Sequence, residues 1–269
     1  YTTRYDDMKL IYADMFALLE DANAAFVKAE ELKNSGEIPQ TDFSALCDYM
    51  YEGNVEKWRR FGNSLYLRLL MRAAMKVEED GGVMDMSGTE HPDFSIVNKI
   101  AELYDCFNSG SGDYPLTRDR KDAAVVGFSK NNSALYTPFY AVTSGNWNSV
   151  IACETLVKEM YNTKKGLADP RYYYYFTKPL GAPTQLFKSN LDAFLAKNVS
   201  AAGNSKVGRY PNGNSGQIGN LKNADRYALM NYSELLFIFA EAGQRGWLNI
   251  SYPVVKKIYL EAVTESALE

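Results

Sequence analysis

The chain has 269 residues and a formal net charge of -4, with 46% hydrophobic and 23% charged residues. This balance is ordinary for a globular protein and leaves enough chain to bury a sizeable core. A nucleic-acid binder needs clustered basic charge to displace counterions from phosphates, so the acidic balance argues against that class. No run of about 18 apolar residues, the length that predicts a membrane-spanning helix, occurs in the sequence.

The first predicted helix begins near Met8 and ends at Asn34-Ser35-Gly36, with Pro39 after it. Asp6 and Asp7 precede it, where the helix dipole favours negative charge. Apolar residues recur at three- and four-residue steps, which is the spacing of one helix face. They are Met8, Ile11, Tyr12, Met15, Leu18, Leu19, Ala22 and Phe26.

A second predicted helix runs from Val55 to about Val77. It carries apolar residues around most of its circumference, which is typical of a helix packed between neighbours. Arg68 and Arg72 then lie near buried surface, and each needs a carboxylate or carbonyl partner. The residues that we expect to be buried against neighbouring helices are Trp58, Leu65 and Leu69.

Further helices are predicted from Phe94 to Phe107 and from Ser149 to Tyr161. Residues 108–148 and 201–223 mix glycine, serine and asparagine with aromatic residues and lack periodicity, which indicates long loops with short strands at most. The last two predicted helices, Tyr227–Arg245 and Pro253–Ser266, form a tetratricopeptide-like pair. The small residues expected where they cross are Ala240, Ala242 and Gly243. The predicted fold class is therefore all-α, with tetratricopeptide-like helix pairs and long loop insertions.

Residues typical of catalysis or metal binding are sparse. The single histidine, His91, lies in a predicted turn, and no nucleophile motif accompanies it. Cys47, Cys106 and Cys153 are far apart and lack the spacing of a zinc site. Adjacent acidic residues lie at predicted helix ends, where solvated charge is the simpler interpretation. We therefore expect no catalysis, no metal and no cofactor.

One predicted loop has the residue types of a sugar-binding surface, where an aromatic ring stacks on a pyranose and amides bond its hydroxyls. In Gly145-Asn146-Trp147-Asn148 the indole of Trp147 stands between two amides. The alternative is that Trp147 is a buried anchor for its loop. Three other aromatic residues are weaker candidates for the ligand-binding surface: Tyr210, in Arg209-Tyr210-Pro211-Asn212, Tyr136 and Tyr140.

Several segments, taken in order, resemble the SusD/RagB family of nutrient-binding lipoproteins. Each alone is common, but their order and spacing together are specific, and they cover most of the chain. They are Tyr51-Glu52-Gly53-Asn54-Val55-Glu56-Lys57-Trp58, Phe61-Gly62-Asn63-Ser64-Leu65-Tyr66-Leu67-Arg68, Asp169-Pro170-Arg171, Tyr232-Ser233-Glu234, Phe239-Ala240-Glu241-Ala242 and Arg245-Gly246-Trp247.

The resemblance implies a single SusD-like helical domain over residues 1–269, without the family's N-terminal lipid-anchor segment and the end of its C-terminal region. It implies a surface-exposed, lipid-anchored outer-membrane protein that binds oligosaccharides and delivers them to a SusC-type TonB-dependent transporter. The motif residues are then expected to be scaffold, hydrogen-bonded between helices: Asn63, Arg68, Asp169, Arg171, Glu234 and Glu241. Two alternatives stay open, a peptide ligand within the same family and a tetratricopeptide-like protein-interaction scaffold without a small ligand.

Overall fold

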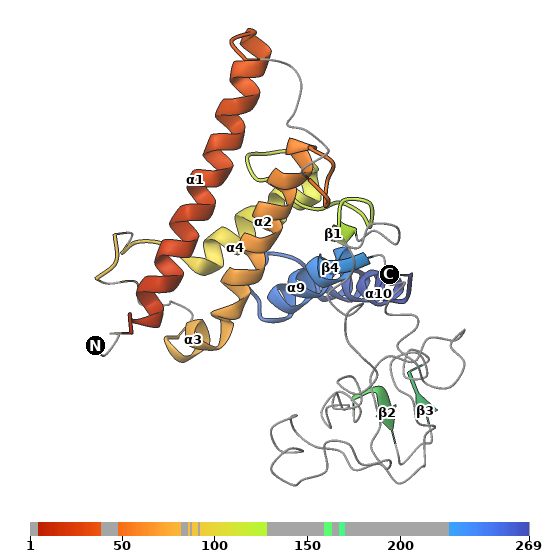
Figure 1. Cartoon of the computed structure of the whole chain (residues 1–269). Helices are drawn as coiled ribbons and strands as arrows, with labels where there is room; N and C mark the ends of the chain where they lie inside the picture. Colours follow the sequence, from red (N-terminus) through yellow and green to blue (C-terminus); the bar gives the residue numbers. More distant parts are fainter. Residues whose placement is uncertain are drawn as a thin grey trace, which may run out of the picture. The chain divides into compact units, whose positions relative to one another are not determined.

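A computed structural model of the chain describes residues 5–38, 48–81, 86, 88–90, 92–127, 159–162, 167–169 and 226–268. The chain divides into two compact units, one formed by Tyr1–Val126 with Ala228–Glu269 and the other by Gly127–Tyr227. The helices of the first unit are α1 (Met8–Ser35), α2 (Val55–Arg72), α3 (Ala74–Glu79), α4 (Ile96–Ser109), α9 (Tyr232–Gln244) and α10 (Tyr252–Leu268) (Figure 1). The short strands β1 (Ala124–Gly127) and β4 (Arg226–Met230) pair with each other.

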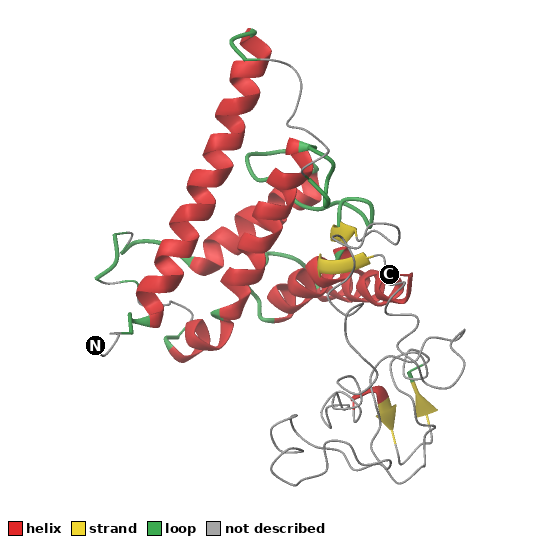
Figure 2. Cartoon of the chain, viewed as in Figure 1, coloured by secondary structure: helices red, strands yellow, loops and turns green. Residues whose placement is uncertain are grey.

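Helices make up most of the described chain (Figure 2), so the predicted all-α class is confirmed. In the second unit β2 (Tyr161–Asn162) runs antiparallel to β3 (Leu167–Ala168). The predicted helix 149–161 lies mostly outside the described residues. Its last residue was wrongly assigned, because Tyr161 pairs with Ala168 in this small sheet.

The first helix matches its predicted bounds. Asp7 caps α1 by accepting a hydrogen bond from the backbone N–H of Lys9 at 2.8 Å. At the other end Gly36 adopts a φ of 81°, and its N–H donates to the carbonyl of Lys33 at 3.1 Å. A left-handed residue ends a helix with little strain when it is glycine, so this stop follows from the sequence.

The second helix is shorter than predicted. It begins at Val55 behind the cap Asn54, whose side chain accepts from the N–H of Lys57 at 3.0 Å. At Ala73 the N–H donates to the carbonyl of Leu70, three residues back, and α3 starts with the next residue. This tighter turn breaks the predicted Val55–Val77 helix into two.

The predicted burial of α2 between neighbouring helices is confirmed in part. Trp58, Leu65 and Leu69 are half-buried. The fully buried side chains belong to the neighbouring face, because α2 packs against α1, α4 and α9 along that side. The buried residues of α2 are Asn63, Ser64, Tyr66, Leu67, Leu70 and Met71.

A buried carboxylate holds the turn that leads into α2. Asp48 accepts hydrogen bonds from the backbone N–H groups of Met50, Tyr51 and Gly53 at 3.0, 3.1 and 2.8 Å. The indole N–H of Trp58 donates to the same carboxylate at 2.8 Å. Burial alone would raise the pKa of Asp48, but these four hydrogen bonds outweigh it and leave the pKa below its usual value.

The later elements follow the predictions in part. Helix α4 starts behind the cap Ser95, close to the predicted Phe94–Phe107. The predicted helix from Tyr227 was wrong over its first residues, because Arg226–Met230 pairs as β4 with β1 and α9 begins only at Tyr232. The helix predicted over Pro253–Ser266 is confirmed as α10.

Small residues allow α9 and α10 to pack closely, as predicted. Ala242 is fully buried, and Ala240 nearly so. A Cβ atom at Gly243 would come within 2.8 Å of a methyl group of Val255 on α10. The close approach of the two helices therefore requires the absence of a side chain at Gly243.

The burial pattern of α2 is tested by a pair of identical substitutions. Leu67→Ala removes a fully buried side chain and should lower the free energy of unfolding by roughly 2–5 kcal/mol. Leu65 lies on the same helix but is half-buried. Leu65→Ala should therefore lower the free energy of unfolding by well under half of that amount. Denaturant unfolding of both variants measures the difference, and equal losses would contradict the observed orientation of α2.

Candidate functional site

Two of the predicted scaffold residues form an ion pair between helices. Nε and one terminal nitrogen of the Arg68 guanidinium donate to the two carboxylate oxygens of Glu234 on α9, each at 2.6 Å. The same guanidinium donates to the carbonyl of Leu229 in β4 at 2.8 Å. Arg68 therefore fixes the end of β4 and the start of α9 to α2, and the predicted need for carboxylate and carbonyl partners is confirmed at this position.

The other scaffold predictions have mixed outcomes. Asn63 is buried, and its amide donates to Asn23 at 3.2 Å and to the carbonyl of Pro115 at 2.9 Å. Glu241 instead pairs with Arg245, the residue that caps the C-terminal end of α9, and Arg245 in turn bonds Glu78 of α3. The expectation of a bond between helices is therefore wrong for Glu241. The backbone N–H of Asp169 donates to the carbonyl of Met160 at 2.8 Å, and Arg171 lies outside the described residues.

A second polar network centres on Glu20 of α1. Its carboxylate accepts hydrogen bonds from the hydroxyls of Tyr66 on α2 and Tyr114, at 2.9 and 2.5 Å. The ammonium of Lys99 on α4 lies 2.8 Å from Glu20 and also 2.8 Å from Glu102. Three helices and the segment after α4 therefore meet at one carboxylate.

The charge states of this network follow from its contacts. Burial alone would raise the pKa of Glu20, but the hydrogen bonds from Lys99, Tyr114 and Tyr66 outweigh it and lower the pKa. Burial of Tyr66 beside Glu20 raises the pKa of its phenol. Burial alone would lower the pKa of Lys99, but its bonds to Glu102 and Glu20 raise it. At neutral pH the network thus holds a carboxylate, an ammonium and neutral tyrosines.

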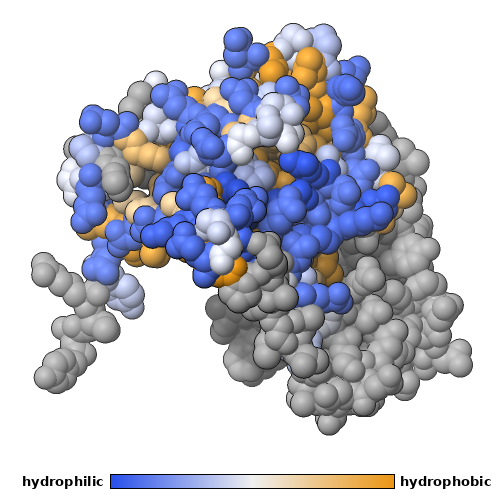
Figure 3. Space-filling view, turned by 90° about the horizontal axis from the view of Figure 1, so that it is seen from above, coloured by the Kyte–Doolittle hydropathy of each residue, from blue (hydrophilic) through white to orange (hydrophobic). Residues whose placement is uncertain are grey.

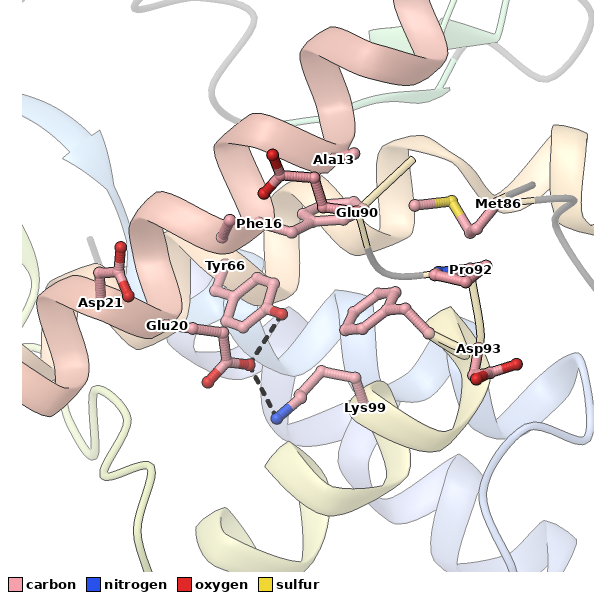
Figure 4. A pocket seen from close by; sticks show the side chains of 12 residues that line it. Ala13, Phe16, Glu20, Asp21, Tyr66, Met86, Glu90, Pro92, Asp93 and Lys99 are labelled. Carbon is pink, nitrogen blue, oxygen red and sulfur yellow. Dashed lines mark hydrogen bonds and ion pairs between the residues drawn. The ribbon is translucent and has the colours of Figure 1, made fainter. Parts of the chain in front are cut away.

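This network forms one wall of a pocket between α1, the start of α4 and the segment that precedes α4, which we call the α1–α4 pocket (Figure 4). Its volume is about 680 Å³, within the range of small-molecule sites. The apolar part of the lining includes Phe16 and Phe94, whose rings stack with centroids 5.5 Å apart, together with Met86 and Pro92.

The polar part of the lining is mainly acidic. Besides Glu20 and Lys99, the carboxylates of Asp21, Glu90 and Asp93 line the α1–α4 pocket, and all three residues are exposed. An aromatic surface next to hydrogen-bond acceptors suits a polar ligand that also has an apolar face, such as a sugar ring.

A second groove, of about 400 Å³, lies between α9 and α10. Phe237, Tyr252 and Tyr259 line it, and the two tyrosines are 68% and 51% exposed. In a tetratricopeptide-like stack the open face of one helix pair is where the next pair packs. This groove therefore does not by itself indicate a small ligand.

The residues that the sequence suggested for ligand binding lie outside the described residues. They are Trp147, Asn146, Asn148, Tyr210, Tyr136 and Tyr140. His91, Cys47 and Cys153 also lie outside them, and Cys106 is a half-buried free thiol. Within the described ranges no cluster of histidine, cysteine and carboxylate side chains could hold a metal ion.

The α1–α4 pocket was not predicted from the sequence. The available signal was Glu20, a carboxylate one turn after Phe16, within the apolar stripe of the first helix. A charge on a buried face requires a partner. That partner, Lys99, comes from a distant segment, so the sequence did not identify it.

Hydrophilic residues cover most of the described surface on the face shown in Figure 3, with smaller hydrophobic patches between them. Among the described residues no helix is both long and apolar enough to cross a bilayer.

A family model described as SusD-like, starch-binding and associating with the outer membrane matches residues 1–269. The chain belongs to the SusD-like family. This confirms the resemblance that the sequence motifs indicated. No curated protein sequence matches the chain.

Solved structures show the same SusD-like fold at low sequence identity. An outer-membrane protein from Bacteroides vulgatus, described as involved in nutrient binding, is 20% identical with a TM-score of 0.61 over 99% of this chain and 50% of its own. A chitin-binding protein is 17% identical with a TM-score of 0.58 over 98% and 49% of the two chains. A SusD homologue from Bacteroides fragilis is 18% identical with a TM-score of 0.58 over 99% and 50%. The present chain thus spans about half the length of these structures.

The Glu20 network makes a pH-dependent contribution to stability. Because folding lowers the pKa of Glu20, this contribution is complete above the pKa of a free glutamate, roughly 4.3, and is lost as the pH falls through the lower folded value. At neutral pH Glu20→Gln should reduce the free energy of unfolding by about 1–2 kcal/mol. The expected loss is modest because the Glu20 side chain is 34% exposed, so that solvent screens part of its charge.

Denaturant unfolding of the wild type and Glu20→Gln from neutral to acidic pH measures this contribution. The two stabilities should converge below the folded pKa of Glu20. A difference that stays constant across the pH range would mean that the carboxylate charge is not stabilising.

Proposed function

We propose that this SusD-like chain is part of a lipid-anchored protein at the surface of the outer membrane. It binds oligosaccharides without chemical turnover and passes them to a SusC-type TonB-dependent transporter. The family description as starch-binding and outer-membrane-associated supports this, as does the similarity to a chitin-binding protein. The observation in the structure that supports it best is the α1–α4 pocket, with its stacked phenyl rings next to carboxylates.

The α1–α4 pocket offers the two kinds of contact that a pyranose ring needs. The half-buried ring of Phe94 can pack on the apolar C–H face of a sugar, and Phe16 supports it from behind. Carboxylates such as Glu90 and Asp93 can accept hydrogen bonds from sugar hydroxyls. Both residues are exposed, so each bond replaces one with water and gains little. Such modest affinity suits a protein that must release its ligand to a pore.

The loop around Trp147 is a second proposed contact surface. Its indole offers an aromatic face, and the amides of Asn146 and Asn148 offer hydrogen-bonding groups, which are the two kinds of contact named above. Weaker candidates for that surface are Tyr210, Tyr136 and Tyr140. A long oligosaccharide can contact more than one such surface, so each surface has to be tested by a substitution of its own.

The α1–α4 pocket is tested by Phe94→Leu, which keeps an apolar side chain but removes the aromatic face. Isothermal titration with neutral oligosaccharides should show affinity reduced several-fold, because the stacking of one ring contributes on the order of 1 kcal/mol. The control is Tyr49→Leu, which removes a 54% exposed ring outside this pocket. Unchanged sugar affinity in a folded Phe94→Leu protein would exclude the pocket as a glycan site. Titration of oligopeptides in parallel tests the alternative that the family ligand is a peptide.

The Trp147 surface is tested by Trp147→Ala. If the indole contacts the ligand, glycan affinity should fall several-fold while the melting temperature stays nearly unchanged. If it is a buried anchor, the free energy of unfolding should instead fall by about 3–5 kcal/mol. Calorimetry of unfolding and of oligosaccharide binding separates the two results. Lost stability with retained affinity would end this part of the proposal.

A further inference from the structure

The α1–α4 pocket carries an excess of negative charge. Four carboxylates and one ammonium line it, namely Glu20, Asp21, Glu90, Asp93 and Lys99, so the lining has three more negative than positive charges. Lys99 is already engaged, because its ammonium lies 2.8 Å from both Glu20 and Glu102. It is therefore not available to neutralise the rest of the lining.

The remaining carboxylates of the α1–α4 pocket come from two elements. Asp21 comes from α1, whereas Glu90 and Asp93 come from the segment before α4, and all three are exposed (Figure 4). No ion pair to any of them occurs within the part of the chain that the structure describes. A ligand in this pocket therefore meets carboxylates from α1 and from the segment before α4, together with the aromatic lining.

This charge discriminates between classes of glycan. A uronic acid or a sulfated sugar would bring a second negative charge close to unpaired carboxylates, and like charges at short range repel. A protonated amine on a sugar would instead form charge-assisted hydrogen bonds with them. Neutral sugars gain neither effect and depend on stacking and ordinary hydrogen bonds.

We propose that the α1–α4 pocket selects oligosaccharides with free amino groups over neutral ones and rejects acidic ones, with Asp21, Glu90 and Asp93 determining this preference. The inference rests on the proposed glycan-binding function and names its substrate class. The cavity and its stacked rings provide the site, and the carboxylates provide its selectivity. Each exposed carboxylate should contribute roughly a 1.5- to 5-fold preference, as exposed ion pairs do.

The experiment titrates the full chain with three ligands of matched length: chitin tetramer, its deacetylated glucosamine tetramer, and galacturonate tetramer. The chitin and glucosamine tetramers have the same sugar backbone. Each acetamide group of the chitin tetramer is an amine in the glucosamine tetramer. The titration is done at about pH 5, where most sugar amines are protonated, because neighbouring oxygen atoms lower the pKa of a sugar amine well below that of a lysine side chain. We expect the glucosamine tetramer to bind most tightly and the galacturonate tetramer most weakly. Added salt should reduce the contrast, because exposed charges are screened.

The triple variant Asp21→Asn, Glu90→Gln, Asp93→Asn should remove the preference for amines, so that the affinity for the glucosamine tetramer falls by more than the affinity for the chitin tetramer. The matched control is Glu31→Gln, an exposed carboxylate on α1 about 15 Å along the helix from Asp21. This control should keep the full preference.

The outcomes separate this inference from the proposed function. If neutral and amino sugars bind equally, or the triple variant keeps the preference, glycan binding stands and the charge selectivity is wrong. If no saccharide binds, both fail. If a lysine trimer binds as tightly as the glucosamine tetramer, the α1–α4 pocket is a general cation site and the inference is overturned.

Discussion

The carboxylate of Glu20 is the point at which three helices of the first unit are bonded together. It joins α1 to Tyr66 on α2 and to Lys99 on α4, and it accepts a further hydrogen bond from Tyr114. A carboxylate facing a packed interior is costly unless it is bonded and paired, and here each oxygen has a donor. The same group forms the polar wall of the α1–α4 pocket. The contact that positions α1 therefore also gives the candidate site its shape.

Helix α2 extends this arrangement to the later part of the chain. It packs against α1, α4 and α9, so its polar side chains must find partners inside the protein. Asn63 bonds Asn23 and the carbonyl of Pro115, while Arg68 bonds Glu234 and the carbonyl of Leu229. These bonds have specific geometry and so add to apolar packing in fixing the rotation of α2. Three of the motif residues, Asn63, Arg68 and Glu234, thus hold helices of the first unit together.

The sequence predicted the helices well where periodicity and end signals agreed. The helix-end residues Asp7 and Gly36 of α1, and the small residues Ala242 and Gly243 of α9, are features that can be read locally in the sequence. Prediction from the sequence failed where a contact between distant segments decides the structure. Nothing at Ala73 marks the break after α2, since alanine favours helix, and β4 is a strand because β1 pairs with it. The α1–α4 pocket requires Glu20 and Lys99 together, and periodicity cannot predict which distant residues meet.

The α1–α4 pocket, built around the Glu20 network, is the glycan-binding site that we propose. The most direct test is a crystal structure of the chain grown with chitin tetramer. We expect a pyranose ring packed on the Phe94 ring, with sugar hydroxyls within hydrogen-bond distance of the Glu90 or Asp93 carboxylate. A tetramer bound at another surface, with the α1–α4 pocket empty of sugar, would contradict it.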